Sequence, residues 1–163
     1  MKKWVIGAVA MIAVVAVLGG CGAKTEKKAA VSDKKTFALK YAELNPNNHI
    51  MDNCADEFAR LVKEKSKGRI TIDVFPAGQL GDEKTAYQTL QMGGGAIDIA
   101  RGNTNSLGDF GAKKLTLFGL PFTFRDREHL WKVLNSDIGP AYLKEMQEIN
   151  SGMVGLFYLD EGA

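Results

Sequence analysis

Three short clusters of polar side chains each follow an apolar stretch of the sequence. They comprise Glu43, Asn45 and His49; Arg101, Asn103, Asn105 and Ser106; and Asp160 and Glu161. Amides and hydroxyls both donate and accept hydrogen bonds, and the remaining side chains add charge. Such a set suits a small solute that carries several hydroxyl or carboxyl groups. The alternative interpretation is that the Asn and Ser residues only form loops.

Other chemistries match the sequence poorly. The three glycines at 93–95 lack the Lys-Ser/Thr of a phosphate-binding loop and end a predicted helix instead of opening one. His49 and His129 are far apart and have no Cys or paired carboxylate at the spacing of metal ligands. No Gly-x-Ser-x-Gly motif or nucleophile–base pair is recognisable. We therefore expect a protein that is not an enzyme and that needs no metal or cofactor.

Alternating strand and helix patterns carry the polar clusters. The patterns predict strands over 37–42, 70–75, 96–100 and 153–158, and helices over 49–67, 82–92, 126–135 and 137–149. Asp126 and Asp137 are the predicted caps of the last two helices. Strands separated by helices indicate a mostly parallel sheet, which binds ligands beyond the carboxyl ends of its strands. We expect the site in the loops that follow Tyr41, Ala100 and Tyr158.

The amino-terminal region predicts export and attachment to a membrane. Lys2 and Lys3 precede an apolar run over 4–17, which is short for a membrane span and typical of a secretory signal. Leu-Gly-Gly-Cys at 18–21 resembles a lipobox, the signal for attaching lipid to the cysteine. A plain signal peptide that happens to contain Cys21 and an uncleaved anchor are the alternatives. We expect three regions: a lipoprotein signal peptide at 1–20, lipidated Cys21 and a flexible tether at 21–36, and a folded solute-binding portion at 37–163.

Charge and cysteine content narrow the class further. Two of the 21 basic residues, Lys2 and Lys3, lie in the predicted signal, so 19 basic residues remain against 19 acidic ones. A near-neutral chain lacks the basic face that nucleic acid requires, and we expect no such partner. With Cys21 lipidated, Cys54 has no disulfide partner and is predicted to be a buried, inert thiol.

Three motifs resemble one known family. The motifs, in order, are Phe-Pro-Ala-Gly-Gln-Leu-Gly-Asp-Glu at 75–83, Gly-Ala-Ile-Asp-Ile-Ala at 95–100 and Leu-Pro-Phe-Thr-Phe-Arg-Asp at 120–126. They are similar to those of the solute-binding proteins of tripartite ATP-independent periplasmic (TRAP) transporters. These proteins capture C4-dicarboxylates, sugar acids and other organic acids. The resemblance covers about residues 37–163.

The resemblance implies a fold and a set of contacts. Members have two α/β lobes that close over an acidic ligand, held mainly by arginines, one of which follows a strand ending like that at 158–163. That arginine and the second lobe would lie beyond Ala163, so we expect an N-terminal portion that binds weakly or not at all by itself. Asn103 matches the position of a polar contact in relatives, with Asn105 and Ser106 following, and 43–45 matches the first-strand loop. Phe122, in the apolar turn, completes the candidate contacts.

Together these observations predict an incomplete α/β lobe of the periplasmic-binding-protein type, with a mostly parallel sheet and flanking helices. The predicted function is delivery of a small organic acid to the subunits of a membrane permease driven by an ion gradient. The expected place is the outer face of the cell membrane or the periplasm, with Cys21 in the lipid. The alternatives are a binding lipoprotein of an ABC importer, a lipid-anchored enzyme and a non-functional fragment.

Overall fold

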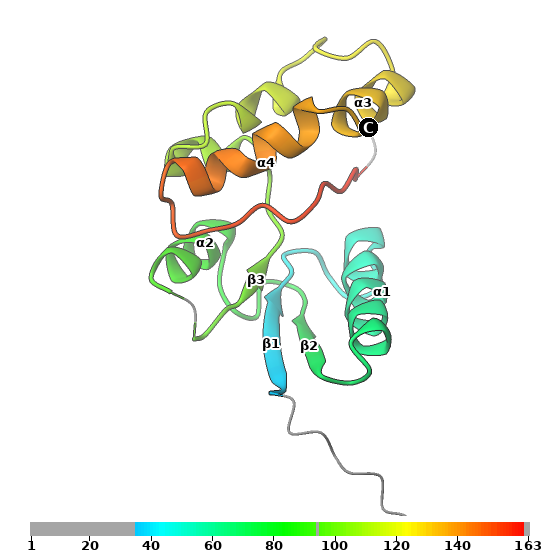
Figure 1. Cartoon of the computed structure of the whole chain (residues 1–163), viewed down its shortest axis with the longest axis vertical. Coiled ribbons are helices and arrows are strands. Elements are labelled where there is room, and N and C mark those ends of the chain that lie inside the picture. Colours follow the sequence, from blue (N-terminus) through cyan, green and yellow to red (C-terminus); the bar gives the residue numbers. More distant parts are fainter. Residues whose placement is uncertain (1–34, 94, 162–163) are drawn as a thin grey trace, which may run out of the picture. The chain divides into compact units, whose positions relative to one another are not determined.

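The computed structural model describes residues 35–93 and 95–161, so Cys21 and the predicted signal lie outside the described residues. Figure 1 shows the order of the elements along the chain. They are β1 (Phe37–Ala42), α1 (Ile50–Lys65), β2 (Ile70–Phe75), α2 (Glu83–Gln91), β3 (Ile99–Ala100), the 3-10 helices η1 (Ser106–Phe110) and η2 (Leu115–Gly119), α3 (Arg127–Leu134) and α4 (Ile138–Glu148). None of these helices is long and apolar enough to cross a membrane.

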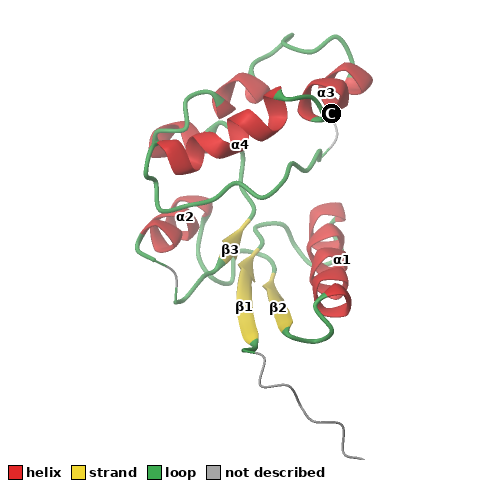
Figure 2. Ribbon diagram, in the orientation of Figure 1, coloured by secondary structure: helices red, strands yellow, loops and turns green. Residues whose placement is uncertain are grey.

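The sheet is parallel, with the strand order β2-β1-β3. Strand β1 pairs with β2 along its whole length, whereas β3 pairs only with the last two residues of β1. Helix α1 packs against β2 and α2 against β3, while α3, α4 and the 3-10 helices lie beyond the carboxyl ends of the strands (Figure 2). The predicted α/β class and parallel sheet are therefore confirmed.

Side-chain caps explain where three helices begin. The Nδ1 atom of His49 accepts a hydrogen bond from the Met51 amide (3.2 Å) at the start of α1. The carboxylates of Asp82 and Asp126 accept from the amides three residues later, at 2.8 and 2.7 Å. Such caps satisfy amides that have no partner within the helix.

The predicted cap of α4 is wrong in its chemistry. Asp137 precedes the helix but makes no capping bond through its side chain, because its backbone is already helical. The hydroxyl of Ser136 accepts from the Ile138 amide instead, at 3.3 Å.

The third predicted strand is shorter than 96–100, since only Ile99 and Ala100 join the ladder. Before them, the Asp98 carboxylate accepts from the Lys40 amide (2.9 Å), and the Asp98 amide donates to the Lys40 carbonyl (3.0 Å). A side chain thus takes one position of the ladder, and Ile97 is left free to enter the core, where it is 1% exposed.

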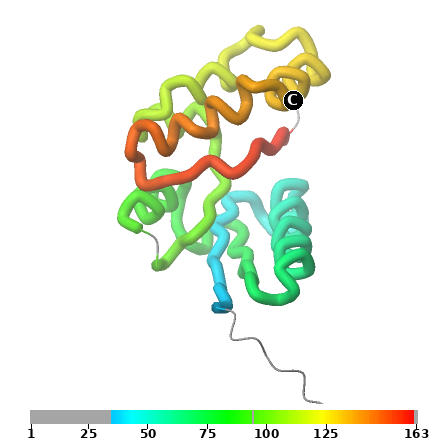
Figure 3. The backbone as a smooth tube through the Cα atoms, viewed as in Figure 1, coloured from blue at the N-terminus to red at the C-terminus, as the bar shows by residue number. Residues whose placement is uncertain are grey.

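The predicted final strand over 153–158 is wrong. This segment forms no ladder and follows α4, as the red tube in Figure 3 shows. A Cβ on Gly155 would lie 2.9 Å from the Leu143 carbonyl of α4, and the Tyr158 hydroxyl donates to the Gly139 carbonyl at 2.9 Å. Apolar residues alternate along this segment because one side of it packs against a helix. In the sequence alone, this pattern cannot be distinguished from that of a strand.

Two apolar clusters hold the sheet and the helices. Ala42, Ala86 and Ile97 are buried between the sheet and α2. Tyr87, Leu115 and Met146 belong to the second cluster, which joins α2 to η2 and α4. Helix α2 contributes adjacent residues to both clusters and so couples the sheet to the helices above it.

The Cys54 thiol differs from the expectation of a buried side chain, because it is only half-buried.

Candidate functional site

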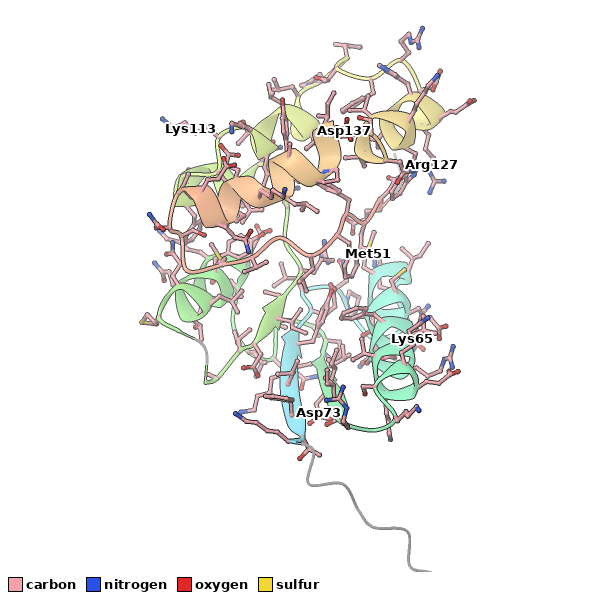
Figure 4. The ribbon with its side chains drawn as sticks, viewed as in Figure 1. Met51, Lys65, Asp73, Lys113, Arg127 and Asp137 are labelled. Atoms are coloured by element: carbon pink, nitrogen blue, oxygen red, sulfur yellow. The ribbon has the colours of Figure 1, made fainter. Side chains whose placement is uncertain are left out.

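A cavity of about 700 Å³ lies beyond the carboxyl ends of β1 and β3. Tyr41 and Arg101 line it from the sheet, and Tyr158 and Glu161 line it from the final segment. Met51, labelled in Figure 4 at the amino end of α1, closes part of its wall. This volume falls in the range of small-molecule sites, and the position is the one at which parallel sheets bind ligands.

A buried ion pair stands at the strand ends. Glu43 follows β1, Arg101 follows β3, and the Arg101 Nε atom lies 3.0 and 2.9 Å from the two carboxylate oxygens of Glu43. The Glu43 side chain is 0% exposed and that of Arg101 is 15% exposed. A buried carboxylate needs a paired charge and hydrogen bonds, and Arg101 supplies the charge.

Two further predicted residues join this pair. The Asn45 amide donates to Glu43 Oε1 at 2.8 Å, and Asn45 Nδ2 donates to Glu161 Oε1 at 3.2 Å. Glu161 Oε2 lies 3.8 Å from Arg101 Nη1. The structure therefore brings together Glu43, Asn45, Arg101 and Glu161, which come from all three polar clusters of the sequence.

The pKa values of two tyrosines that line the cavity, Tyr41 and Tyr158, are raised. Burial raises the pKa of Tyr41 to about 12, the Glu43 carboxylate adds to the rise, and Arg101 opposes it. Burial also raises the pKa of Tyr158, to about 12, with smaller contributions from Tyr142 and Glu145. Both phenols therefore remain neutral hydrogen-bonding groups at physiological pH.

The second polar cluster forms its own network. The Asn103 amide and the Ser106 hydroxyl donate to the two carboxylate oxygens of Glu83, the latter at 2.6 Å. The Asn105 amide donates to Asn103 Oδ1 at 2.9 Å. Asn103 and Asn105 line the cavity, whereas Ser106 lies on a separate shallow surface with Glu83.

Three predicted contacts lie elsewhere or have other partners. His49 caps α1 and does not line the cavity, and Phe122 is fully exposed and also outside it. Asp160 lines the cavity, but its carboxylate pairs with Arg127 Nε at 2.6 Å. Figure 4 labels Arg127 beside the final segment. Within the described ranges, no group of His, Cys, Asp and Glu side chains is arranged to hold a metal ion.

The sequence model of a family described as bacterial extracellular solute-binding protein, family 7, matches residues 41–163. The chain belongs to this family. It is 29% identical over 108 residues to the C4-dicarboxylate-binding periplasmic protein of Rhodobacter capsulatus, a match that covers 66% of this chain and 31% of the relative.

Solved structures of TRAP periplasmic solute-binding proteins have the same fold. One from a Bradyrhizobium species, in complex with D-galacturonate, is 32% identical with a TM-score of 0.67 and matches 74% of this chain and 39% of its own. Another from Sulfurospirillum deleyianum, with bound succinate, is 26% identical with a TM-score of 0.60 and matches 71% and 36%. The chain thus spans about a third of the length of these relatives.

Two residues of this candidate site are not predicted from the sequence. In the sequence, Glu83 stands out only as part of a motif at a helix start, although it anchors the loop after β3 through two hydrogen bonds. Nothing around Tyr87 in the sequence indicates a role at the site, yet its hydroxyl lies so close to Gly102 that a Cβ there would collide with it. The glycine between Arg101 and Asn103 was the one available signal, because close approach to another group often requires glycine.

Proposed function

We propose that this chain is part of an extracytoplasmic solute-binding protein that captures a small organic acid and delivers it to an ion-gradient-driven TRAP permease. The observation that carries the proposal is the cavity at the carboxyl ends of β1 and β3, where Arg101, Asn103 and Asn105 present polar groups. Membership of family 7 supports the same role, as do the galacturonate and succinate bound by similar proteins.

The site is suited to holding a solute without transforming it. Arg101 is fixed by Glu43, and the Asn103–Asn105 turn is fixed by Glu83, so their remaining donors are held in place before a solute arrives. Preorganised donors avoid the cost of ordering flexible side chains on binding. A cavity of about 700 Å³ is large enough for an acid of four to six carbons.

The amino-terminal region is suited to attachment to a membrane. We propose that residues 1–20 are a signal peptide and that lipidated Cys21 holds the protein through the tether at 21–36. The apolar run after Lys2 and Lys3 and the lipobox at 18–21 support this proposal. A tethered binding protein remains near its permease while its folded portion is free to capture solute.

Calorimetric titration of the mature full-length protein with a panel of organic acids tests the function. We expect at least one acid to bind with a dissociation constant in the micromolar range or below. At a hundred-fold excess over that constant, the acid stabilises the fold by about 2.7 kcal/mol. Binding of a neutral sugar, a peptide or a metal ion, with no response to any organic acid, would contradict the proposal.

A further inference from the structure

Cationic side chains gather at the end of the sheet away from the cavity, although the charges of the whole chain nearly balance. Helix α1 leads through residues 66–69 into β2, and the Phe37 amide at the start of β1 donates to the Arg69 carbonyl at 2.8 Å (Figure 1). This end of the sheet carries five exposed cations, and Figure 4 labels Lys65 among them. The basic end, as we call it, comprises Lys35, Lys63, Lys65, Lys67 and Arg69.

Carboxylates do not neutralise the basic end. Within residues 35–93 and 95–161, none of its five cationic side chains forms an ion pair. On α1, the carboxylates of Glu57 and Glu64 bond to Arg60 instead, at 2.7 and 2.9 Å. On β2, Asp73 is in register with Lys40 of β1. The basic end therefore keeps an excess of positive charge.

An exposed aromatic ring lies among these cations. Phe37 is 42% exposed, and the Lys35 Nζ atom lies 5.3 Å from the centroid of its ring. At the surface of a bilayer, apolar side chains enter the headgroup layer while lysine side chains reach the phosphates. The combination of an exposed ring with several cations therefore suits a lipid surface.

The chain leaves the folded portion at this same end. Lys35 lies two residues before β1, and about fourteen residues separate it from Cys21 in the sequence. If Cys21 carries lipid, a coil of that length places Lys35 at an r.m.s. distance of roughly 20 Å from the anchor. The basic end is then close to the membrane. It also lies at the surface of the complete protein, because the chain passes out of the fold there.

We propose that the basic end lies against the anionic phospholipid headgroups of the membrane that carries the lipid anchor. The inference rests on the membrane attachment in the proposed function and adds a second contact to it. Each cation close to an anionic surface strengthens membrane binding by about five-fold. The tether makes this contact intramolecular, so a modest affinity is enough. The contact leaves the cavity, at the other end of the strands, open to solute.

Sedimentation with lipid vesicles tests the contact. The mature full-length protein is made from Gly22 onward, so that it carries no lipid. It is mixed with vesicles of phosphatidylcholine alone, or of phosphatidylcholine with about a third of phosphatidylglycerol. We expect binding to the anionic vesicles at about 0.1 M salt and loss of that binding at about 0.5 M, because salt screens the attraction. Binding to pure phosphatidylcholine should be negligible.

A triple variant separates the position of the charges from the net charge. Changing Lys63, Lys65 and Lys67 to Gln should weaken binding to the anionic vesicles by about a hundred-fold. The matched control removes three charges from exposed lysines near η2, α3 and α4, and should bind within about three-fold of the wild type. Its substitutions are Lys113→Gln, Lys132→Gln and Lys144→Gln.

Several outcomes would overturn the inference. They are failure of the wild-type protein to bind anionic vesicles, equal binding to both kinds of vesicle, and equal losses in the triple variant and its control. Wild-type binding by the triple variant would also overturn it, by assigning the contact to the tether. Solute affinity and lipid labelling of Cys21 are measured separately, so none of these outcomes contradicts the proposed function.

Discussion

Glu43 and Arg101 lie 58 positions apart in the chain and meet because β1 and β3 are neighbours in the sheet. Each is the first residue after its strand, where the hydrogen-bond ladder continues from the Glu43 amide to the Phe75 carbonyl and from the Arg101 amide to the Ala42 carbonyl. The sequence predicted that both residues face one sheet edge. It could not predict that they bind each other, because pairing depends on the relative position of two strands.

Loss of the guanidinium should destabilise the fold. Arg101→Ala leaves the buried Glu43 carboxylate without its countercharge, and we expect the free energy of unfolding to fall by about 3–5 kcal/mol in urea denaturation. The control is Arg60→Ala, which removes exposed ion pairs with Glu57 and Glu64 and should cost at most about 1 kcal/mol. Equal losses in the two variants would contradict the role given to Arg101.

Tyr41 predicts a specific weakness at alkaline pH. Its pKa is about 12 in the folded protein and 10.0 in the reference state, so the folded state disfavours the phenolate. The associated stability is fully present below pH 10 and is lost as the pH rises from 10 to 12, a loss of roughly 2.7 kcal/mol. Tyr41→Phe cannot ionise and should lose less stability over that interval. The same decline in both proteins, measured by urea denaturation at each pH, would argue against a buried phenol.

At the scale of the elements, strands β1 and β2 and the α-helices of the described residues were predictable from periodicity and caps. The bounds of β1 and β2 match the prediction, and each helix lies within the predicted range. The predictions of strands over 96–100 and 153–158 fail for local reasons. Asp98 replaces one backbone position beside β1, which shortens β3, and the segment over 153–158 packs on α4 instead of pairing. Apolar alternation reports burial on one side and does not identify the partner.

The two predicted aspartate caps should differ when tested. Asp126→Ala removes the acceptor of the His129 amide and should lower the free energy of unfolding by about 1 kcal/mol. Asp137→Ala removes no capping bond, and we expect a smaller change, within about 0.5 kcal/mol. Urea denaturation of both variants is the measurement. A larger loss in Asp137→Ala than in Asp126→Ala would contradict the observed caps.

At the scale of the whole molecule, the three motifs predicted the family, and the match over residues 41–163 confirms it. Part of the site was predictable for the same reason that the fold was, because polar residues after parallel strands share one edge. Glu83, Tyr87 and Arg127 were not, since they lie on helices, where they contact residues of the candidate site, and nothing in their spacing indicates those contacts.

Attachment of the whole protein to the membrane through lipid on Cys21 is also a prediction. Cys21→Ser removes the thiol that would receive the lipid, so the protein should move from the membrane fraction to the soluble exported fraction and lose lipid labelling. Cys54→Ser is the matched control and should remain membrane-bound. A Cys21→Ser product that still carries lipid and stays in the membrane fraction would refute the lipoprotein assignment.

The central claim is that the cavity beyond β1 and β3 holds the solute, and the affinity of asparagine variants tests it most directly. In the mature full-length protein, Asn103→Ala and Asn105→Ala each remove a polar group from the cavity wall. Calorimetry should show affinity for the organic acid reduced by about one to two decades, while the free energy of unfolding changes little in Asn105→Ala and by at most about 1 kcal/mol in Asn103→Ala, which also loses the bond from the Asn105 backbone amide. Asn53→Ala, on the exposed face of α1, should bind as the wild type does. Wild-type affinity in both cavity variants would contradict the claim.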